Sequence, residues 1–208
     1  MSTYVSPIYL LHGTTGEPVP GELRDVIGET ELEHWEDHWI PYLHEKLRDM
    51  KGRGVPREEW PQHRHWDWRS KAADVEMMLA QRGFAVRCEG MTQGLLVVDL
   101  VQDCRLESQR GKPLVYLEYV EAAPWNQPRL QNPPKYRGVG SVLVAAAVSL
   151  SLEEGFAGRI GLHSLRQADA FYSGHCGMTE LGRDAEKQNL MYFEMTPEQA
   201  QAFLHKGD

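Results

Sequence analysis

Apolar residues recur at helical spacing in the first quarter of the chain. A strongly acidic stretch begins at Glu22, and its apolar positions are Leu32, Trp35, Trp39, Tyr42, Leu43 and Leu47. A repeat of three to four residues predicts a helix with one buried face. Before it, Pro7–Leu11 predicts a short strand, and the stretch Gly13–Gly21, rich in Gly and Pro, predicts a loop. Ala72–Arg82 predicts a further helix that ends at Gly83.

The middle of the chain changes to short apolar runs rich in β-branched residues. Phe84–Cys88, Gly94–Val101 and Leu114–Val120 are three strand candidates with Gly- or Pro-containing connections. Consecutive strands joined by short connections predict an antiparallel meander.

The most apolar segment is Ser141–Glu154, which is non-polar nearly all round. A helix of this kind is expected to be buried. The next run, Arg159–Leu165, predicts a strand that lies parallel to Leu114–Val120, because a helical crossover joins the two. The remaining predicted elements are a short helix from Ala168, a strand over 190–195 and a helix over 196–203.

Composition narrows the class of protein. The 208 residues suffice for one well-buried domain, and the formal charge of −8 argues against nucleic acid as the default partner. No apolar run approaches the roughly 20 residues of a membrane span, and no signal-peptide pattern opens the chain. Three cysteines without CxxC spacing suit a reducing compartment. We therefore expect a cytoplasmic protein.

Two glycines stand immediately before the apolar helix. Gly138 and Gly140 let the backbone approach a ligand closely, and the first turn of a helix offers unpaired N–H groups to an anion. Spacing excludes two familiar phosphate motifs. The P-loop pattern is absent, and Leu143 occupies the third glycine position of a Rossmann fingerprint.

The pattern Lys135-x-x-Gly138-x-Gly140 resembles the pyrophosphate loop of the GNAT acetyltransferase superfamily. Lys135 stands where Arg or Gln is usual, and Arg137 before Gly138 is a familiar neighbour in that family. From the loop alone, a Gly-rich turn before an ordinary core helix stays an open alternative.

The order of the predicted elements also resembles GNAT proteins. Tyr119–Pro124 lies where the central strand of the superfamily splays from its parallel neighbour, and Ala168-x-x-Phe171-Tyr172 followed by Gly177-Met178 resembles the late helix. The resemblance covers roughly residues 84–195. It implies an α/β fold with a mixed, mostly antiparallel central sheet, a splayed parallel strand pair and flanking helices.

We accordingly expect one domain over residues 1–208, with a helical, Trp- and His-rich N-terminal part over 1–80 and a cofactor-binding core over 84–195. The sequence departs from the family in three places. These are an insertion over Trp125–Pro133, one extra residue between Tyr172 and Gly177, and Leu165 in place of a common Asn.

The resemblance implies acetyl-coenzyme A as the acyl donor and an amine as the acceptor. The pyrophosphate would lie on backbone N–H groups, with Lys135 or Arg137 adding charge. The residues that supply those groups are Arg137, Gly138, Val139, Gly140, Ser141 and Val142. The pantetheine arm would bond to the backbone of Val120 and Ala122.

An alkyl amine has a pKa of about 10, so a carboxylate must take its proton. Glu118 and Glu121 lie three residues apart on one predicted strand and so face opposite sides, and which of them faces the cleft stays open. Glu118 is the first choice because apolar residues flank it, although a salt-bridged strand carboxylate is the alternative. The resemblance places Tyr172 beside the thioester sulfur as general acid; the alternative is a core aromatic.

Several further interpretations stay open. The segment from Trp60 to Trp68 forms either a tryptophan-rich satellite core or a wall of the acceptor pocket. The acidic helix is either a solvated face or attracts a cationic acceptor. Zinc ligands are conceivable, although we expect no metal; the candidates are His34, His38, His63, His65 and Asp67. The fold could also serve as a catalytically silent acyl-CoA sensor. The acceptor, a small molecule or a protein, and a homodimer are left open.

Overall fold

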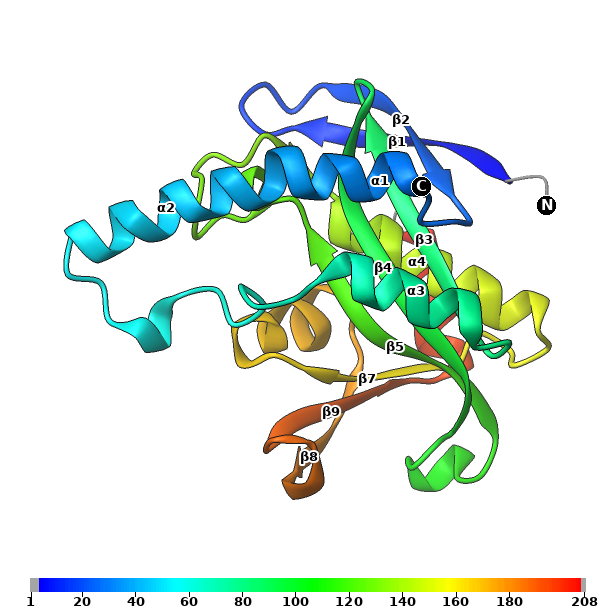
Figure 1. The fold of residues 1–208 in the computed structure, drawn as a ribbon. Coiled ribbons are helices and arrows are strands. Elements are labelled where there is room, and N and C mark those ends of the chain that lie inside the picture. Colours follow the sequence, from blue (N-terminus) through cyan, green and yellow to red (C-terminus); the bar gives the residue numbers. More distant parts are fainter. Residues whose placement is uncertain (1–3, 207–208) are drawn as a thin grey trace. The chain divides into compact units, whose positions relative to one another are not determined.

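The structure is a computed structural model that describes residues 4–206 (Figure 1). The chain forms two compact units. The first contains the residues up to Val97 together with Val120–Leu143, and the second contains Val98–Tyr119 together with the residues from Val144 onward. Three elements contribute residues to both units: β4 (Met91–Asp103), β5 (Pro113–Ala122) and α4 (Val139–Glu153).

The strands of the first unit pair in the order β6-β1-β2-β3-β4. Strands β1 (Val5–His12) and β2 (Pro18–Arg24) form an antiparallel hairpin. Strand β2 continues antiparallel onto β3 (Gln81–Cys88), and β1 pairs antiparallel with the two-residue strand β6 (Tyr136–Arg137).

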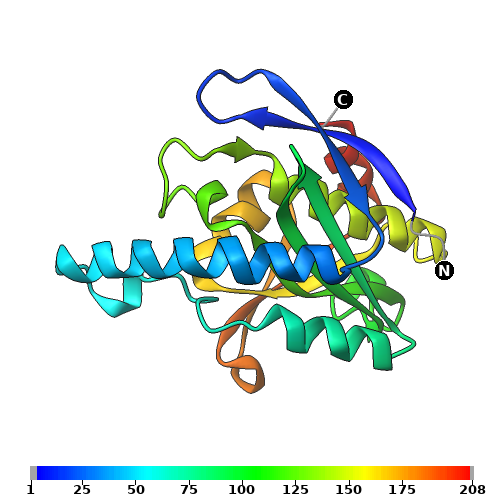
Figure 2. The same cartoon turned by 45° about the horizontal axis from the view of Figure 1, so that its top comes forward.

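The helices of the first unit bury one face, as the periodicity predicts. Helix α1 (Glu29–His34) continues through a π-helical turn at Trp35–Trp39 into α2 (Ile40–Gly52), and Figure 2 shows them as one long helix. Trp39 is 1% exposed. Helix α3 (Trp68–Met77) begins at its cap, Asp67, whose side chain accepts a hydrogen bond from the backbone of Ser70.

Two local predictions were wrong. The predicted loop Gly13–Gly21 contains half of β2, because Pro18 and Pro20 occupy exposed positions of the hairpin. Gly21 is needed within that strand, since a Cβ there would lie 2.6 Å from the carbonyl oxygen of Arg87. The long helix therefore begins at Glu29 and not near Glu22.

The boundaries of α3 were also misplaced. The helix starts at Trp68 rather than Ala72 and ends at Met77. Gly83 lies inside β3, where a Cβ would approach Ile27 to 3.1 Å. Gly83 thus permits close packing against Ile27, and α3 does not end there.

The second unit carries the parallel strand pair. Its strands pair in the order β5-β7-β9-β8. Strand β7 (Ile160–Ser164) lies parallel to β5, with Leu117 opposite Leu162, as the helical crossover predicts. Strand β9 (Leu190–Met195) pairs antiparallel with β7 and with β8 (Thr179–Asp184), which the sequence pattern did not predict. Helix α5 (Pro197–His205) is the last helix described, and Thr196 forms a capping box at its start.

The predicted fold class is confirmed: the fold is mixed α/β, with mostly antiparallel pairing, one parallel pair and flanking helices. The prediction of a single domain stays a prediction. None of the helices in residues 4–206 has the length and apolar character that a membrane span requires.

Candidate active site

The glycine loop leads directly into the apolar helix. Gly138 has φ +94°, a conformation that only glycine adopts without strain, and α4 begins at the next residue. A Cβ at Gly138 would meet no atom within 4 Å, so the backbone conformation, and not a lack of space, requires glycine. Gly138 is exposed, and the backbone N–H of Val142 is the one that bonds back to its carbonyl, at 3.0 Å. The 15-residue helix begins directly after this exposed glycine, and the N-terminus of such a helix is suited to bind an anion.

The N-terminal hairpin holds this loop in place. Strand β6 pairs with the end of β1, and the backbone N–H of Gly13 donates to the carbonyl of Lys135 at 2.8 Å. A Cβ at Gly13 would lie 1.6 Å from the carbonyl oxygen of Pro134, so only glycine fits this contact. The hydroxyl of buried Tyr136 donates to Glu89 at 2.6 Å. The loop is therefore fixed before any ligand arrives.

Two cations flank the loop, and their surroundings differ. The ammonium of Lys135 lies 3.4 Å from the carboxylate of Glu89 and over the ring of Tyr136. Arg137 is exposed, and no carboxylate in residues 4–206 pairs with its guanidinium. The guanidinium of Arg137 is therefore more available than the ammonium of Lys135 to bind a ligand anion.

Glu121 lies near the end of β5 and is 6% exposed. One carboxyl oxygen accepts a hydrogen bond from the indole of Trp68 at 2.5 Å, and the other lies 3.4 Å from Nε2 of His63. The side-chain amide of Gln127 donates to the same Nε2 at 3.1 Å and to the carbonyl of Ala122 at 2.7 Å. Nε2 of His63 is therefore an acceptor, and the ring proton belongs on Nδ1.

Burial controls the protonation of this pair. It raises the pKa of Glu121 to about 8, against the lowering effect of the Trp68 hydrogen bond. Burial also lowers the pKa of His63 to about 4, with added repulsion from His65 and Arg64. At neutral pH the pair consists of a protonated carboxyl group and an uncharged imidazole. A carboxyl group whose pKa lies near 8 is suited to proton transfer at physiological pH.

These pKa shifts predict an unusual pH dependence of stability. Folding raises the pKa of Glu121 above its ordinary value of 4.5, so the unfolding free energy falls as pH rises from 4.5 to 8. Folding lowers the pKa of His63 from 6.5, so the unfolding free energy rises with pH between pH 4 and 6.5. The two effects cancel up to pH 6.5, and from there to pH 8 the unfolding free energy should fall by about 2 kcal/mol at most. Urea unfolding across this range should show that fall in the wild type.

The matched control for that measurement is Glu121→Gln, which keeps the acceptor for Trp68 but cannot titrate. The fall between pH 6.5 and 8 should disappear in this variant. An unchanged slope would mean that Glu121 ionises at an ordinary pKa.

The Trp- and His-rich segment contributes both to packing and to the surroundings of Glu121. Trp68 is fully buried, and Trp66 packs edge-on against it with ring centroids 6.4 Å apart, as in the predicted satellite core. The same segment supplies both contacts of the Glu121 carboxyl group. Sequence analysis named Glu121 and this segment separately and could not join them, because 53 residues separate Trp68 from Glu121.

The structure brings together some predicted site residues and not others. Glu121, Ala122 and the loop all belong to the first unit. The carbonyl of Ala122, predicted to bond pantetheine, accepts the Gln127 amide here, and Val120 is half-buried. Glu118 is half-buried and belongs to the second unit.

Tyr172 lies in a π-helical turn of the second unit, Phe171–His175. It is 6% exposed and packs against Phe171 and Phe193. Burial raises its pKa above the ordinary value for a phenol, so the hydroxyl is protonated at neutral pH. Its role as an acid stays a prediction.

The histidines and acidic residues of the long helix have local partners. His34 Nδ1 lies 2.9 Å from the hydroxyl of Thr92. Within residues 4–206, no group of three or more His, Cys, Asp or Glu side chains is placed to hold a metal ion. Glu29 and Glu36 both bond to Arg69, so part of the acidic face is neutralised by α3.

The fold is of the GNAT acetyltransferase type, as predicted from the loop and the element order. PaiA N-acetyltransferase from Thermoplasma acidophilum, crystallised with coenzyme A, matches with a TM-score of 0.50 at 11% identity, over 94% of this chain and 99% of its own. RimJ from Mycobacterium smegmatis, solved with CoA-disulfide, matches with a TM-score of 0.52 at 17% identity, over 99% and 95%. Identities this low establish the fold alone. A scan against protein-family models finds no match, and neither does a search of curated proteins.

Proposed function

We propose that this protein transfers an acetyl group from acetyl-coenzyme A directly to an amine acceptor. The observation that carries the proposal is the exposed turn at Gly138, which opens onto α4 and is fixed by the hairpin. PaiA and RimJ, the two solved structures compared above, were both determined with a coenzyme A species, which supports the choice of donor. In this proposal the pyrophosphate binds the N–H groups of residues 137–141, because the N–H of Val142 already bonds to the carbonyl of Gly138. Val120 and Ala122 meet the pantetheine arm.

Within this proposal, Arg137 is the main charged contact of the donor. We expect Arg137→Ala to weaken binding of acetyl-coenzyme A about tenfold or more, because charge-assisted hydrogen bonds to phosphate are strong. Lys135→Ala should weaken it less, since Glu89 already shares the charge of that ammonium. Calorimetric titration of both variants measures which one loses more affinity for acetyl-coenzyme A. A larger loss of affinity for Lys135→Ala would reverse the assignment.

Glu121 is the base that we assign to the reaction. Its carboxyl group is held by Trp68 and His63, and its pKa of about 8 suits removal of a proton from an ammonium group. His63 is the more exposed of the pair, with 14% of its side chain accessible against 5% for Glu121. Because Glu121 itself is nearly buried, a water molecule carries the proton from the amine to the ionised carboxylate in this proposal. Glu118, on the opposite face of β5, is the first choice from the sequence and the second candidate here.

Tyr172 is the acid that we assign to the leaving thiolate. Its hydroxyl is protonated at neutral pH because burial raises its pKa. Tyr172→Phe should lower kcat about 100-fold and leave the affinity for acetyl-coenzyme A unchanged. Phe171→Tyr, at the neighbouring ring, serves as the control for packing. Full turnover in Tyr172→Phe would remove the acid role.

The activity itself is tested by release of free thiol from acetyl-coenzyme A in the presence of a panel of primary amines. Acetylated product, identified by mass spectrometry, is the expected result. Saturable donor binding without turnover on any amine would favour the acyl-CoA sensor instead.

A further inference from the structure

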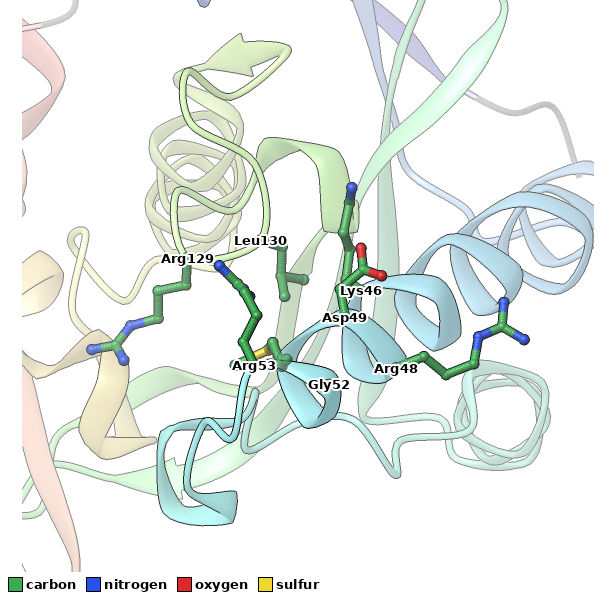
Figure 3. Close-up of a pocket in the computed structure, with 8 residues that line it drawn as sticks. Lys46, Arg48, Asp49, Gly52, Arg53, Arg129 and Leu130 are labelled. Atoms are coloured by element: carbon green, nitrogen blue, oxygen red, sulfur yellow. The ribbon is translucent and has the colours of Figure 1, made fainter.

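A cavity of about 580 Å³ lies in the first unit, between the C-terminal half of α2 and the insertion that follows β5. Figure 3 shows its lining, to which α2 contributes Lys46 and Asp49, the residue after α2 contributes Arg53, and the insertion contributes Arg129 and Leu130. The mechanism proposed above uses none of these side chains. The cavity is therefore a second feature of this unit that needs an explanation.

The two walls of the cavity are fixed to each other. The hydroxyl of Tyr42, on α2, donates to the side-chain carbonyl of Gln131 at 2.5 Å. The ammonium of Lys46 lies 4.9 Å from the centre of the Tyr42 ring, and Met50 is 6% exposed. The exposed arginine side chains thus project from two backbone segments whose relative position is set before binding.

The charge of the lining is strongly positive. The lining residues include four cations, Lys46, Arg48, Arg53 and Arg129, and one carboxylate, Asp49. In the part of the chain that the structure describes, no carboxylate pairs with the guanidinium of Arg53 or of Arg129. Figure 3 shows these two side chains extending to the same side of Leu130, whereas Arg48 points away from them. Cations collected in a concave site attract an anion, and guanidinium groups match the geometry of phosphate and carboxylate.

We propose that this cavity binds an anionic group, phosphate or carboxylate, of the acceptor, so that the acceptor is an amine that also carries negative charge. This inference rests on the proposed acetyltransferase function. The link to the reaction is the insertion itself, because the segment with Arg129 also presents Gln127 to His63 and Ala122. An acceptor held by Arg53 and Arg129 is bound by the same segment that supports the candidate base.

The first test measures anion binding without catalysis. Inorganic phosphate is titrated calorimetrically into Gly138→Glu, a background in which the glycine loop cannot compete for phosphate. Saturable binding is expected, and adding Arg53→Ala and Arg129→Ala together should weaken it at least about tenfold. Arg48→Ala is the matched control, because it removes one positive charge whose side chain points away, and it should bind phosphate nearly as the background does. Absence of binding, or equal binding in all variants, would overturn the proposal.

The second test asks whether the anion belongs to the acceptor. O-phosphoethanolamine and β-alanine are compared with ethanolamine and propylamine as competitors for bound phosphate and as acetyl acceptors. The amines that carry an anionic group should displace phosphate and should have a KM at least about tenfold lower than their counterparts without that group, a difference lost in the double variant. Which of the two anionic groups is preferred distinguishes phosphate from carboxylate. Equal displacement by amines with and without an anionic group would overturn the assignment.

The two proposals fail in different ways. If no amine is acetylated, the acetyltransferase function fails, yet phosphate titration and displacement still decide the cavity. If amines with and without an anionic group are acetylated equally well and the double variant changes neither binding nor transfer, the cavity proposal fails while the function stands.

Discussion

Glu121→Gln should lower kcat by about 100- to 10,000-fold while leaving the affinity for acetyl-coenzyme A nearly unchanged. The amide is close in size to the carboxyl group and still accepts the hydrogen bond from Trp68, so the variant should fold. It cannot take a proton from the attacking amine. The wild-type kcat should rise with pH through about 8, since the carboxyl group must ionise before it acts, and this inflection should be absent in the variant.

Glu118→Gln provides the matched control, because it makes the same chemical change three residues earlier on the same strand and on its opposite face. We expect it to retain most of the activity. A large loss in Glu118→Gln together with near-normal turnover in Glu121→Gln would transfer the role to Glu118.

Gly138→Glu should weaken binding of acetyl-coenzyme A about 100-fold or more. The substitution forces a side chain into a φ of +94° and places a carboxylate where the pyrophosphate would lie. The strain alone can be measured with Gly111→Glu, because Gly111 has φ +73°, is exposed, and likewise has no atom within 4 Å of an added Cβ. That control should cost comparable stability and leave binding intact. Equal loss of binding in both variants would attribute the effect to folding.

The loop and its helix could be predicted because their signals are local. Gly138 and Gly140 stand at fixed spacing before an uninterrupted apolar run, and neighbouring residues decide both the turn and the helix. The support of the loop could not be predicted. It depends on the contact of Gly13 with Lys135 and on β2, whose prolines suggest a loop when the sequence is considered alone.

The carboxylates illustrate the same limit within the site. From the sequence, Glu118 is the first choice because apolar residues flank it, yet Glu121 also stands between apolar neighbours, and the pattern does not show which face of the strand meets a ligand. Burial by Trp68 and contact with His63 distinguish Glu121, and both come from a segment distant in the chain. Periodicity reports which face of an element is buried, and it does not report what covers that face.

The acidic helix has less negative charge available for a ligand than its sequence suggests. Its density of carboxylates suggests attraction of a cation, yet Glu29 and Glu36 are both bound to Arg69. Positive charge with no carboxylate partner among residues 4–206 gathers instead at Arg53 and Arg129, which are distant in sequence and line one cavity.

The most direct test of donor binding is calorimetric titration of the wild-type protein with acetyl-coenzyme A, with free coenzyme A and with NAD. Saturable binding of both coenzyme A species and no binding of NAD is the predicted result, because a turn opened by Gly138 lacks the third glycine of a dinucleotide fingerprint. Failure of either coenzyme A species to bind would contradict the assignment of the loop and, with it, the proposed acetyl transfer.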